Sequence, residues 1–358
     1  MRPSVVALRV RTLASVSGTA AGAYGLSRVG AARLALRLRR RNGFDVESAL
    51  MDGLLDPAMD DRTRFAHMGR AVRHVAQDRL DPLSMWPISE QKLHFYDYMR
   101  ASGVPVPEVF GTVGAAGVWS RRDGAAVTGP DAVARFLGGL PGDLVVKPSY
   151  GARAVGVRVL VRAREGFDDL RGEPVDMRVL AEELRADPSD VHLVQERLVN
   201  HPLIEEITGS PVLQTLRIVA IVRPDGSVLL VFAVLKLALG TADTDNFLSG
   251  STGNGYSQMT LDDGRLGDLT VRAPEGYGLV SSPVVPSTGV RVRGRPLPFF
   301  EEACDLVRRT SALMLPMRTL GWDVAITPDG PVILESNVWW APFGPLSAEA
   351  WALLTGER

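Results

Sequence analysis

The sequence lacks the features of a disulfide-stabilised, redox-active or membrane-spanning protein. Cys304 is the only cysteine among 358 residues, which excludes an internal disulfide, a cysteine-based zinc site and a CxxC redox pair. A single thiol indicates a reducing compartment, so we expect a cytoplasmic protein. No uncharged run approaches the roughly 20 residues of a membrane helix, and we expect no integral membrane span. The longest candidate, residues 227–240, contains Lys236 and is typical of a buried strand.

Lysine is almost as scarce as cysteine. The chain has 40 basic residues, and only Lys92, Lys147 and Lys236 among them are lysine. Lysine offers a compact ammonium group where arginine offers a planar fork. In a chain that otherwise uses arginine as its cation, these three positions are candidate binding residues.

Acidic and basic residues nearly cancel. The net charge of −1 does not indicate a nucleic-acid partner. The charge is uneven, because residues 1–42 contain nine arginines and no acidic residue. Residues 27–41 have two interpretations: a basic helix that contacts a membrane surface or another anionic partner, or a solvated or disordered terminus. The thin apolar face favours the second.

Residues 321–337, GWDVAITPDGPVILESN, predict a β-hairpin with a polar cluster at its open end. The Pro-Asp-Gly sequence supplies the fixed and the permissive φ of a tight turn. Antiparallel strands place the start of one beside the end of the other, so Asp323 should lie near Glu335 and Asn337. Glu335 and Asn337 are two apart and share a face. Two carboxylates and an amide oxygen are suitable ligands for Mg²⁺.

The alternative is that the two acids of this hairpin are unrelated surface residues, since short motifs often match by chance. Glu335 argues against it. This residue ends the apolar run 331–334, where an unpaired charge is costly.

Residues 145–161 predict two strands around a glycine loop, with Lys147 at the end of the first strand. Gly151 and Gly156 bracket the loop. Its backbone N–H groups could bind a phosphate, or the segment could be an ordinary glycine hairpin. It is not a Walker loop, because the lysine precedes the glycines and no helix follows. Before it, residues 89–107 predict a helix that Ser89 caps.

Residues 213–222 and 227–237 predict a second hairpin. Thr215 and Arg217 are two apart and face the same side, and Lys236 lies near the end of the return strand. Two cations and a hydroxyl on paired strands indicate an anion site. The alternative is that Arg217 is a paired structural arginine.

The order of these motifs resembles the ATP-grasp superfamily, including D-alanine–D-alanine ligase. A lysine in an early helix is followed by a strand lysine before a glycine loop, a Gln-Glu pair after a strand, and Asp…Glu-x-Asn near the end. The segments QERLVNHPLIEEITGSPVLQTLRIVAIV, DNFLSGSTGNG and GWDVAITPDGPVILESN are similar to the sugar-transfer associated ATP-grasp branch. The resemblance covers residues 86–340.

The resemblance implies an α+β fold in which two subdomains grip ATP. Residues 86–200 would form the subdomain with the glycine lid loop, and residues 201–358 the subdomain with the Mg²⁺ site. An Arg-rich segment, residues 1–42, helical or disordered, and a helical region, residues 43–85, would precede them.

The resemblance also implies roles for individual residues. For ATP, it implies two phosphate-binding lysines, Lys92 and Lys147, and a lid loop with Ser149, Gly151 and Gly156. It also implies an adenine hinge, formed by Gln195, Glu196, Arg197 and Leu198, and an amide, Asn246. One or two Mg²⁺ ions, or Mn²⁺, would be held by Asp323, Glu335 and Asn337. Arg217 would steady the transferred phosphoryl group, with Lys236 beside it.

One departure from the family concerns the residues after the Glu-x-Asn motif. Relatives have small residues and a proline-glycine pair there, whereas this chain has Trp339 and Trp340. The metal ligands are kept, so the departure indicates an unusual acceptor pocket rather than different ATP chemistry. The glycine loop and the two tryptophans are candidate covers that exclude water.

This chemistry implies an ADP-forming carboxylate–amine ligase. A small-molecule carboxylate would attack the γ-phosphate to give an acyl-phosphate, and an amine would displace the phosphate. The branch name associates the chain with polysaccharide, cell-surface or secondary-metabolite biosynthesis. The alternatives are a phosphotransferase and a non-catalytic nucleotide-binding partner, although the complete ligand set argues against the latter. For the ligase, we expect Asp323→Asn or Glu335→Gln to abolish turnover and to leave the fold largely intact.

Overall fold

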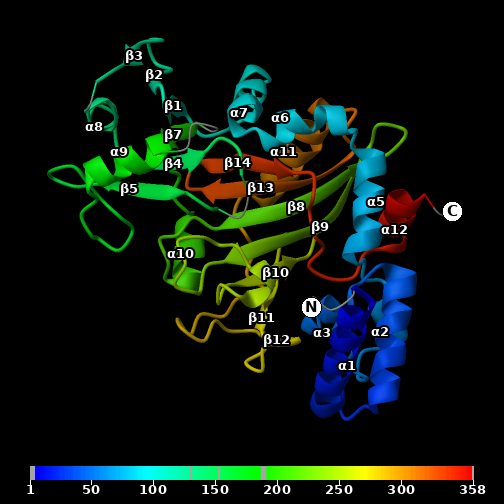
Figure 1. Ribbon diagram of the computed structural model, residues 1–358. Helices are drawn as coiled ribbons and strands as arrows, with labels where there is room; N and C mark the ends of the chain where they lie inside the picture. Colours follow the sequence, from blue (N-terminus) through cyan, green and yellow to red (C-terminus); the bar gives the residue numbers. More distant parts are fainter. Residues whose placement is uncertain (1–4, 130, 152–153, 187–190, 357–358) are drawn as a thin grey trace.

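Two antiparallel sheets form the body of the protein (Figure 1). The computed structural model describes residues 5–129, 131–151, 154–186 and 191–356, with only the backbone given for 5–10. Within these ranges the first sheet has the order β3-β2-β1-β7-β4-β5-β6 and the second β12-β11-β10-β9-β8-β13-β14. The predicted α+β fold is confirmed.

The strands of the first sheet are short, and helices α8 (Ala132–Gly138) and α9 (Met177–Ala186) pack against it. Leu180 and Leu184 of α9 are four apart, so one apolar stripe of that helix enters the core. The strands are β1 (Val109–Gly114), β2 (Gly117–Ser120), β3 (Ala126–Val127), β4 (Leu144–Pro148), β5 (Arg158–Arg162), β6 (Phe167–Asp168) and β7 (His192–Glu196).

The second sheet is buried on both faces in its centre. Leu216 and Ile218 of β8 enter the core with α7 (Lys92–Ala101), α10 (Pro202–Thr208) and α11 (Phe300–Leu313), whereas Val219 and Ile221 enter the core with α5 (Arg70–Leu80) and α12 (Ala348–Thr355). A small bulge between Val219 and Ala220 shifts the register against β9. The strands are β8 (Thr215–Val222), β9 (Val228–Leu237), β10 (Gly255–Met259), β11 (Leu266–Arg272), β12 (Leu279–Ser282), β13 (Thr319–Thr327) and β14 (Gly330–Asn337).

Helix α7 packs with the second sheet. Phe95, Tyr96 and Met99 are buried in the core that contains Trp322 of β13. The predicted boundary at residue 86 groups this helix with the first sheet, whereas its buried residues lie in the core of the second sheet. The predicted N-cap is wrong: Ser89 lies inside the short helix α6 (Trp86–Glu90), and its hydroxyl pairs with that of Ser336 at 2.7 Å.

The N-terminal region is a small helical bundle. Helices α1 (Val5–Tyr24), α2 (Arg28–Asn42), α3 (Val46–Met51) and α4 (Asp61–Phe65) pack around one apolar cluster. Ser27 caps α2, and Ala31, Ala35 and Leu38 face the cluster at helical spacing. Between the described residues 5 and 42 the chain is therefore mostly helical. Short 3₁₀ turns occur at η1 (Leu83–Met85) and η2 (Leu248–Gly250).

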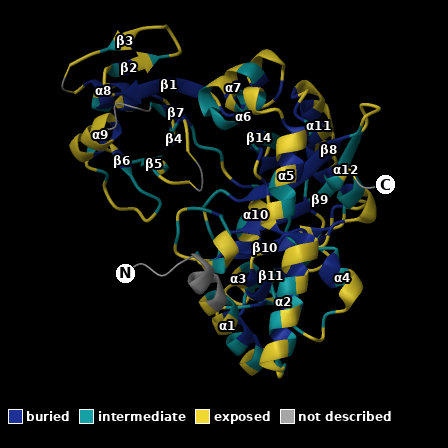
Figure 2. Ribbon diagram, turned by 45° about the vertical axis from the view of Figure 1, so that its right-hand side comes forward, coloured by how far each residue is buried: buried dark blue, intermediate teal, exposed yellow. Residues whose placement is uncertain are grey.

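The arginines of α2 are exposed, and Figure 2 shows exposed stretches alternating with less exposed ones along this helix. Because the apolar side of α2 is covered by its neighbours, this helix presents charge rather than an apolar stripe to any surface that it contacts. Arg37 pairs with Asp61 at 3.2 Å and lies over the ring of Phe65. None of the helices in the described ranges is long and apolar enough to cross a bilayer.

Candidate active site

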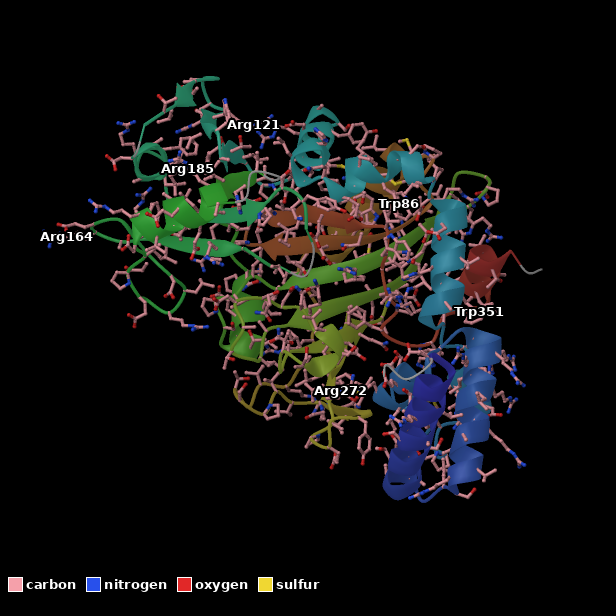
Figure 3. The ribbon with its side chains drawn as sticks, viewed as in Figure 1. Trp86, Arg121, Arg164, Arg185, Arg272 and Trp351 are labelled. Atoms are coloured by element: carbon pink, nitrogen blue, oxygen red, sulfur yellow. The ribbon has the colours of Figure 1, made fainter. Side chains whose placement is uncertain are left out.

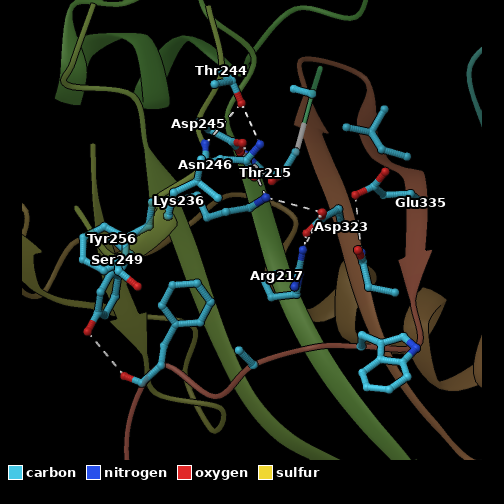
Figure 4. Close-up of a pocket in the computed structure, with 18 of the residues that line it drawn as sticks. Thr215, Arg217, Lys236, Thr244, Asp245, Asn246, Ser249, Tyr256, Asp323 and Glu335 are labelled. Carbon is cyan, nitrogen blue, oxygen red and sulfur yellow. Dashed lines mark hydrogen bonds and ion pairs between the residues drawn. The ribbon is translucent and has the colours of Figure 1, made fainter. Parts of the chain in front are cut away.

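A cavity of about 950 Å³ is lined by both sheets and by the N-terminal helical region. This volume is at the upper end of the roughly 300–1,000 Å³ of small-molecule sites. Figure 4 shows the part where β8, β9, β13 and β14 meet. The predicted residues that line the cavity are Lys92, Lys147, Gly151, Gln195, Arg197, Leu198, Arg217, Lys236, Asn246, Asp323, Glu335 and Asn337.

A buried ion network lies at the centre of Figure 4. Asp323 faces Arg217 across the β13–β8 ladder, and the guanidinium grips it with Nε–Oδ1 at 2.5 Å and Nη2–Oδ2 at 2.8 Å. Lys236 Nζ lies 3.3 Å from Asp323 Oδ2. Burial raises the pKa of Asp323, but Arg217 and Lys236 outweigh it and hold that pKa well below its usual range. The predicted anion site is therefore already occupied by a carboxylate of the chain.

Asp245 is a member of this network that the sequence interpretation missed. Its Oδ1 lies 3.4 Å from Lys236 Nζ, and its Oδ2 accepts hydrogen bonds from Thr215 N at 2.8 Å and Thr215 Oγ1 at 2.6 Å. The signal was the buried lysine itself, since such a charge requires acidic partners. The neighbouring Asn246 lines the cavity, and its Nδ2 donates to Thr244 Oγ1 at 2.9 Å.

The β13–β14 hairpin brings the predicted metal ligands together. Asp323 is the cross-strand partner of Glu335, and Asn337 Nδ2 lies 3.4 Å from Glu335 Oε1. Burial, and then the charge of Asp323, raise the pKa of Glu335. No cluster of three or more His, Cys, Asp or Glu suited to a metal occurs in the described ranges. The hairpin set has two carboxylates and one amide, so a bound ion would require further oxygens from its substrate.

Two lysines, Lys92 and Lys147, also line the cavity. The Lys147 ammonium is buried and donates to Tyr96 Oη at 2.7 Å, and that hydroxyl donates to Leu334 O at 2.8 Å. Burial lowers the pKa of Lys147 to about 7; Glu335 opposes this and Lys92 adds to it. Lys92 Nζ donates to Gly151 O at 2.7 Å. Tyr96 was not found from the sequence, because its contact with Lys147 joins two distant elements.

The residues of the glycine loop, between β4 and β5, that line the cavity differ from those predicted. Gly151 and the segment 154–155 line the cavity, while residues 152–153 lie outside the described residues. Ser149 does not line it: its buried hydroxyl donates to Gln91 Oε1, and its carbonyl accepts from Lys92 N at 2.9 Å. Ser149 thus ties the loop to the start of α7. Gly156 packs on Pro148, where a Cβ would approach the ring to 2.9 Å.

The predicted hinge is formed by the end of β7. Gln195, Arg197 and Leu198 line the cavity. The Gln195 Oε1 atom is buried and has no hydrogen-bond partner among the described residues. Arg197 pairs with Asp143 at 2.8 Å. Glu196 does not line the cavity, because its carboxylate accepts from Glu108 N at 2.8 Å.

The two tryptophans after the hairpin have separate environments. Trp339 is 41% exposed and lines the cavity, and the centroids of its ring and of the His74 ring are 3.7 Å apart. Trp340 is fully buried with α5 and α12, and its Nε1 donates to Thr319 at 3.1 Å. Gly321 allows this, because a Cβ there would lie 2.7 Å from Trp340 Cβ. Only Trp339 can cover the site, so the expectation for Trp340 was wrong.

Two antiparallel sheets thus line one cavity that contains lysines and a carboxylate hairpin, an arrangement typical of a nucleotide-grasping fold. The family described as sugar-transfer associated ATP-grasp matches residues 72–345, and the chain belongs to it. A comparison with curated proteins found no match.

Solved ligases have distant similarity. D-alanyl-alanine synthetase A from Vibrio cholerae is 11% identical with a TM-score of 0.38, covering 73% of this chain and 59% of that one. L-amino acid ligase from Bacillus licheniformis is 10% identical with a TM-score of 0.37, covering 72% and 42%. D-alanine–D-alanine ligase from Bacillus anthracis is 11% identical with a TM-score of 0.36, covering 71% and 58%. The chain spans 42% to 59% of the length of these three proteins.

Proposed function

We propose that this protein is an ATP- and Mg²⁺-dependent, ADP-forming carboxylate–amine ligase that works through an acyl-phosphate. The observation that carries the proposal is the cavity itself. It is lined by Lys92 and Lys147 and also by Asp323, Glu335 and Asn337. Phosphates placed in it would meet both cations and hard oxygen ligands.

The nucleotide fits the end of the cavity at β7. Gln195 Oε1 is a buried acceptor without a partner among the described residues, and the adenine amino group is a donor that could satisfy it. On β4, Lys147 is two residues beyond Val145, the cross-strand partner of Gln195, and Glu335 acts on its charge, so the triphosphate would extend past Lys147 toward the hairpin. The Gly151 carbonyl holds Lys92, so the loop and the phosphate-binding lysine would move together.

The hairpin fits a divalent ion. Carboxylate and amide oxygens suit Mg²⁺ and also Mn²⁺, and Glu335 and Asn337 would hold one or two ions with Asp323 and phosphate oxygens. Such an ion offsets the charge of the transferred phosphoryl group. Arg217 would bind an oxygen of the substrate. Asp323 engages its Nε and Nη2, which leaves Nη1 for an oxygen of the substrate.

The reaction forms a C–O–P linkage when the substrate carboxylate attacks the γ-phosphorus, and it breaks the bond to the β-phosphate oxygen, so that ADP leaves. An amine then attacks the acyl carbon, loses a proton and expels phosphate. The fixed cations Lys147, Arg217 and Lys236 stabilise the charge without reorganising. The glycine loop and Trp339 exclude the water that would hydrolyse the acyl-phosphate.

We place this activity in the cytoplasm, where ATP and Mg²⁺ are supplied, and within the synthesis of polysaccharides or other cell-surface or secondary metabolites. The family description supports the second point. A contact of residues 27–41 with an anionic membrane would be electrostatic, because Ala31, Ala35 and Leu38 are buried in the helical bundle.

The test is a trapping assay. The full-length protein is incubated with Mg-ATP, hydroxylamine and pools of amino acids, sugar acids and other small carboxylates, and the products are identified by mass. ADP with a hydroxamate supports the ligase and names its carboxylate. ADP with a phosphorylated compound and no hydroxamate indicates a phosphotransferase. No ATP consumption in any pool contradicts the proposal and favours a non-catalytic nucleotide-binding protein.

A further inference from the structure

Helix α5 presents basic residues to the cavity at a distance from the ion network. Arg70, Arg73 and His74 line the cavity, and their spacing of three and four residues places them on one face of the helix. Asp52, just after α3, lines the same end. These residues belong to the N-terminal helical region, which the roles inferred from the sequence left without chemistry.

Arg73 is incompletely satisfied. In the described ranges its guanidinium makes no hydrogen bond or salt bridge, and its Nε is buried without a partner. Burial, and then the charge of Arg70, lower the pKa of Arg73 to about 10, and Asp52 opposes them. Arg73 is therefore charged at neutral pH. A buried donor left unpaired is unfavourable, so the position favours a ligand that completes it.

Arg272 is partly engaged. Its Nε and Nη1 donate to Ser249 O, Met51 O and Gly278 O and hold the second sheet to the N-terminal bundle (Figure 3), whereas its Nη2 is buried without a partner in the described ranges. His74 packs edge-on against Trp339, and burial lowers the pKa of His74 to about 4, so it is neutral. Arg70 is exposed to the cavity. Arg70 and Arg73 thus line this end of the cavity with one acid, Asp52; burial raises the pKa of Asp52 to about 6, and the charge of Arg272 opposes this.

This charge centre is separate from the ion network. Arg217 lies on β8 and pairs with Asp323, which also pairs with Lys236, and Lys236 pairs with Asp245. In the described ranges no hydrogen bond or ion pair connects Arg73, on α5, to these residues. One cavity thus contains two centres, one internally paired and one with excess positive charge. The segment after β14 lies beside α5, since Gln77 Nε2 donates to Trp340 O at 3.0 Å (Figure 1).

We propose that Arg73, assisted by Arg70, binds an anionic group of the acceptor substrate, a carboxylate or phosphoryl group other than the one activated by ATP. A guanidinium fork matches both groups in two-point geometry. The cavity volume accommodates a second substrate beside a nucleotide. The identity of the occupant as an acceptor rests on the ligase function proposed above, whereas the anion site itself rests on the geometry of α5.

The test measures anion binding without turnover. The full-length protein is saturated with Mg²⁺ and AMP-PNP, which fills the γ-phosphate position, and is titrated with inorganic phosphate or with succinate. Calorimetry gives the affinity, and the fluorescence of Trp339, which touches His74, reports the site. Binding of phosphate but not succinate assigns a phosphoryl group, and the reverse assigns a carboxylate.

Arg73→Gln should weaken the bound anion at least tenfold, and Arg70→Gln less, because Arg70 is more exposed. Arg73→Lys, which keeps the charge and loses the fork, should give an intermediate affinity and covers the case in which Arg73→Gln does not fold. Arg33→Gln, on the exposed side of α2, is the control with the same charge change and should bind as the wild type does. AMP-PNP affinity should be equal in all four.

The proposal is overturned if neither anion binds the wild type under these conditions, or if the Arg73 variants bind it as tightly as the wild type. If anion binding depends on Arg73 but the protein forms no hydroxamate, the ligase proposal is contradicted and the anion site is still supported. The two failures are therefore distinguishable.

Discussion

The two charge centres of the cavity use the same residue type in opposite ways. Arg217 lies on a strand, and the ladder between β8 and β13 places Asp323 directly opposite, so its fork is filled by the chain itself. Arg73 lies on a helix whose neighbours give it no hydrogen-bonding partner in the described ranges. The register of the sheet thus pairs Arg217 with Asp323, whereas Arg73 on α5 keeps an unpaired charge that a ligand can bind.

The first consequence is that Asp323 supports the fold as well as the chemistry. Asp323→Asn leaves Arg217 and Lys236 buried without their main counter-charge, and we expect a loss of about 3–5 kcal/mol in the free energy of unfolding. Urea denaturation measures it. This revises the expectation from the sequence that the fold would remain largely intact.

Asp305→Asn is the matched control, because Asp305 forms an exposed pair with Arg308 at 2.7 Å. Surface pairs contribute about 0–1 kcal/mol, so this change should be small. Equal stability of the Asp323 and Asp305 variants would contradict the distinction between the buried network and ordinary ion pairs.

Asp81, at the end of α5, extends the comparison to an acid. Its Oδ1 accepts from Arg318 N at 2.7 Å and Thr319 N at 2.9 Å, but its Oδ2 is buried without a partner in the described part of the chain. Burial raises the pKa of Asp81 to about 7, above the ordinary value of about 3.9. The stability that this carboxyl contributes is therefore complete below pH 4 and is lost as the pH rises through 7.

The wild type should lose about 3 kcal/mol of unfolding free energy from this group between pH 5 and pH 8. Asp81→Asn keeps the acceptor for both N–H groups and removes the titration, so it should lose correspondingly less. Urea denaturation of both proteins at the two pH values decides. Parallel losses would show that Asp81 is not the titrating group.

Glu335→Gln compares a predicted metal ligand with the paired residues of the ion network. Asn337 Nδ2 donates to Glu335 Oε1 at 3.4 Å, and burial and the charge of Asp323 both raise the pKa of Glu335, so the loss of this charge should change stability little. Changes beyond the direct ligands cost about 10–100-fold in metal affinity, and loss of a ligand should cost at least about 100-fold. Mn²⁺ affinity by electron paramagnetic resonance checks this, with the exposed Glu302→Gln as control. Wild-type affinity in Glu335→Gln would remove it from the metal site.

Tyr96→Phe should have the smallest effect of these substitutions. Its hydroxyl holds the Lys147 ammonium and contacts Leu334 O, so its removal should weaken ATP binding by up to about tenfold, the value of one hydrogen bond. Tyr98→Phe is the control on the same helix, where the hydroxyl donates to Leu313 O at 2.6 Å instead. Equal ATP affinity in the two variants would contradict a positioning role for Tyr96.

The sequence predicts the parts of the site that follow from strand alternation. The β13–β14 hairpin, the pairing of Asp323 with Glu335, and the shared face of Thr215 and Arg217 all depend on the two-residue period of a strand. These predictions are confirmed as geometry. The roles of the residues in binding ATP or metal stay predictions.

Contacts between distant elements were not predictable in this way. Asp245 reaches Lys236 from an irregular loop, and Tyr96 reaches Lys147 from a helix that packs on the other sheet. Neither contact leaves a periodic pattern in one segment. The pairing of Arg217 with Asp323 was open for the same reason, because the order of strands within a sheet is set by the whole fold.

The most direct test of the account is a crystal structure with Mg²⁺ and AMP-PNP. We predict adenine against Gln195 and Leu198, phosphates between Lys92 and Lys147, and metal on Glu335 and Asn337, with Asp323 and Arg217 still paired. A nucleotide bound outside this cavity, or a metal that contacts neither Glu335 nor Asn337, would contradict it.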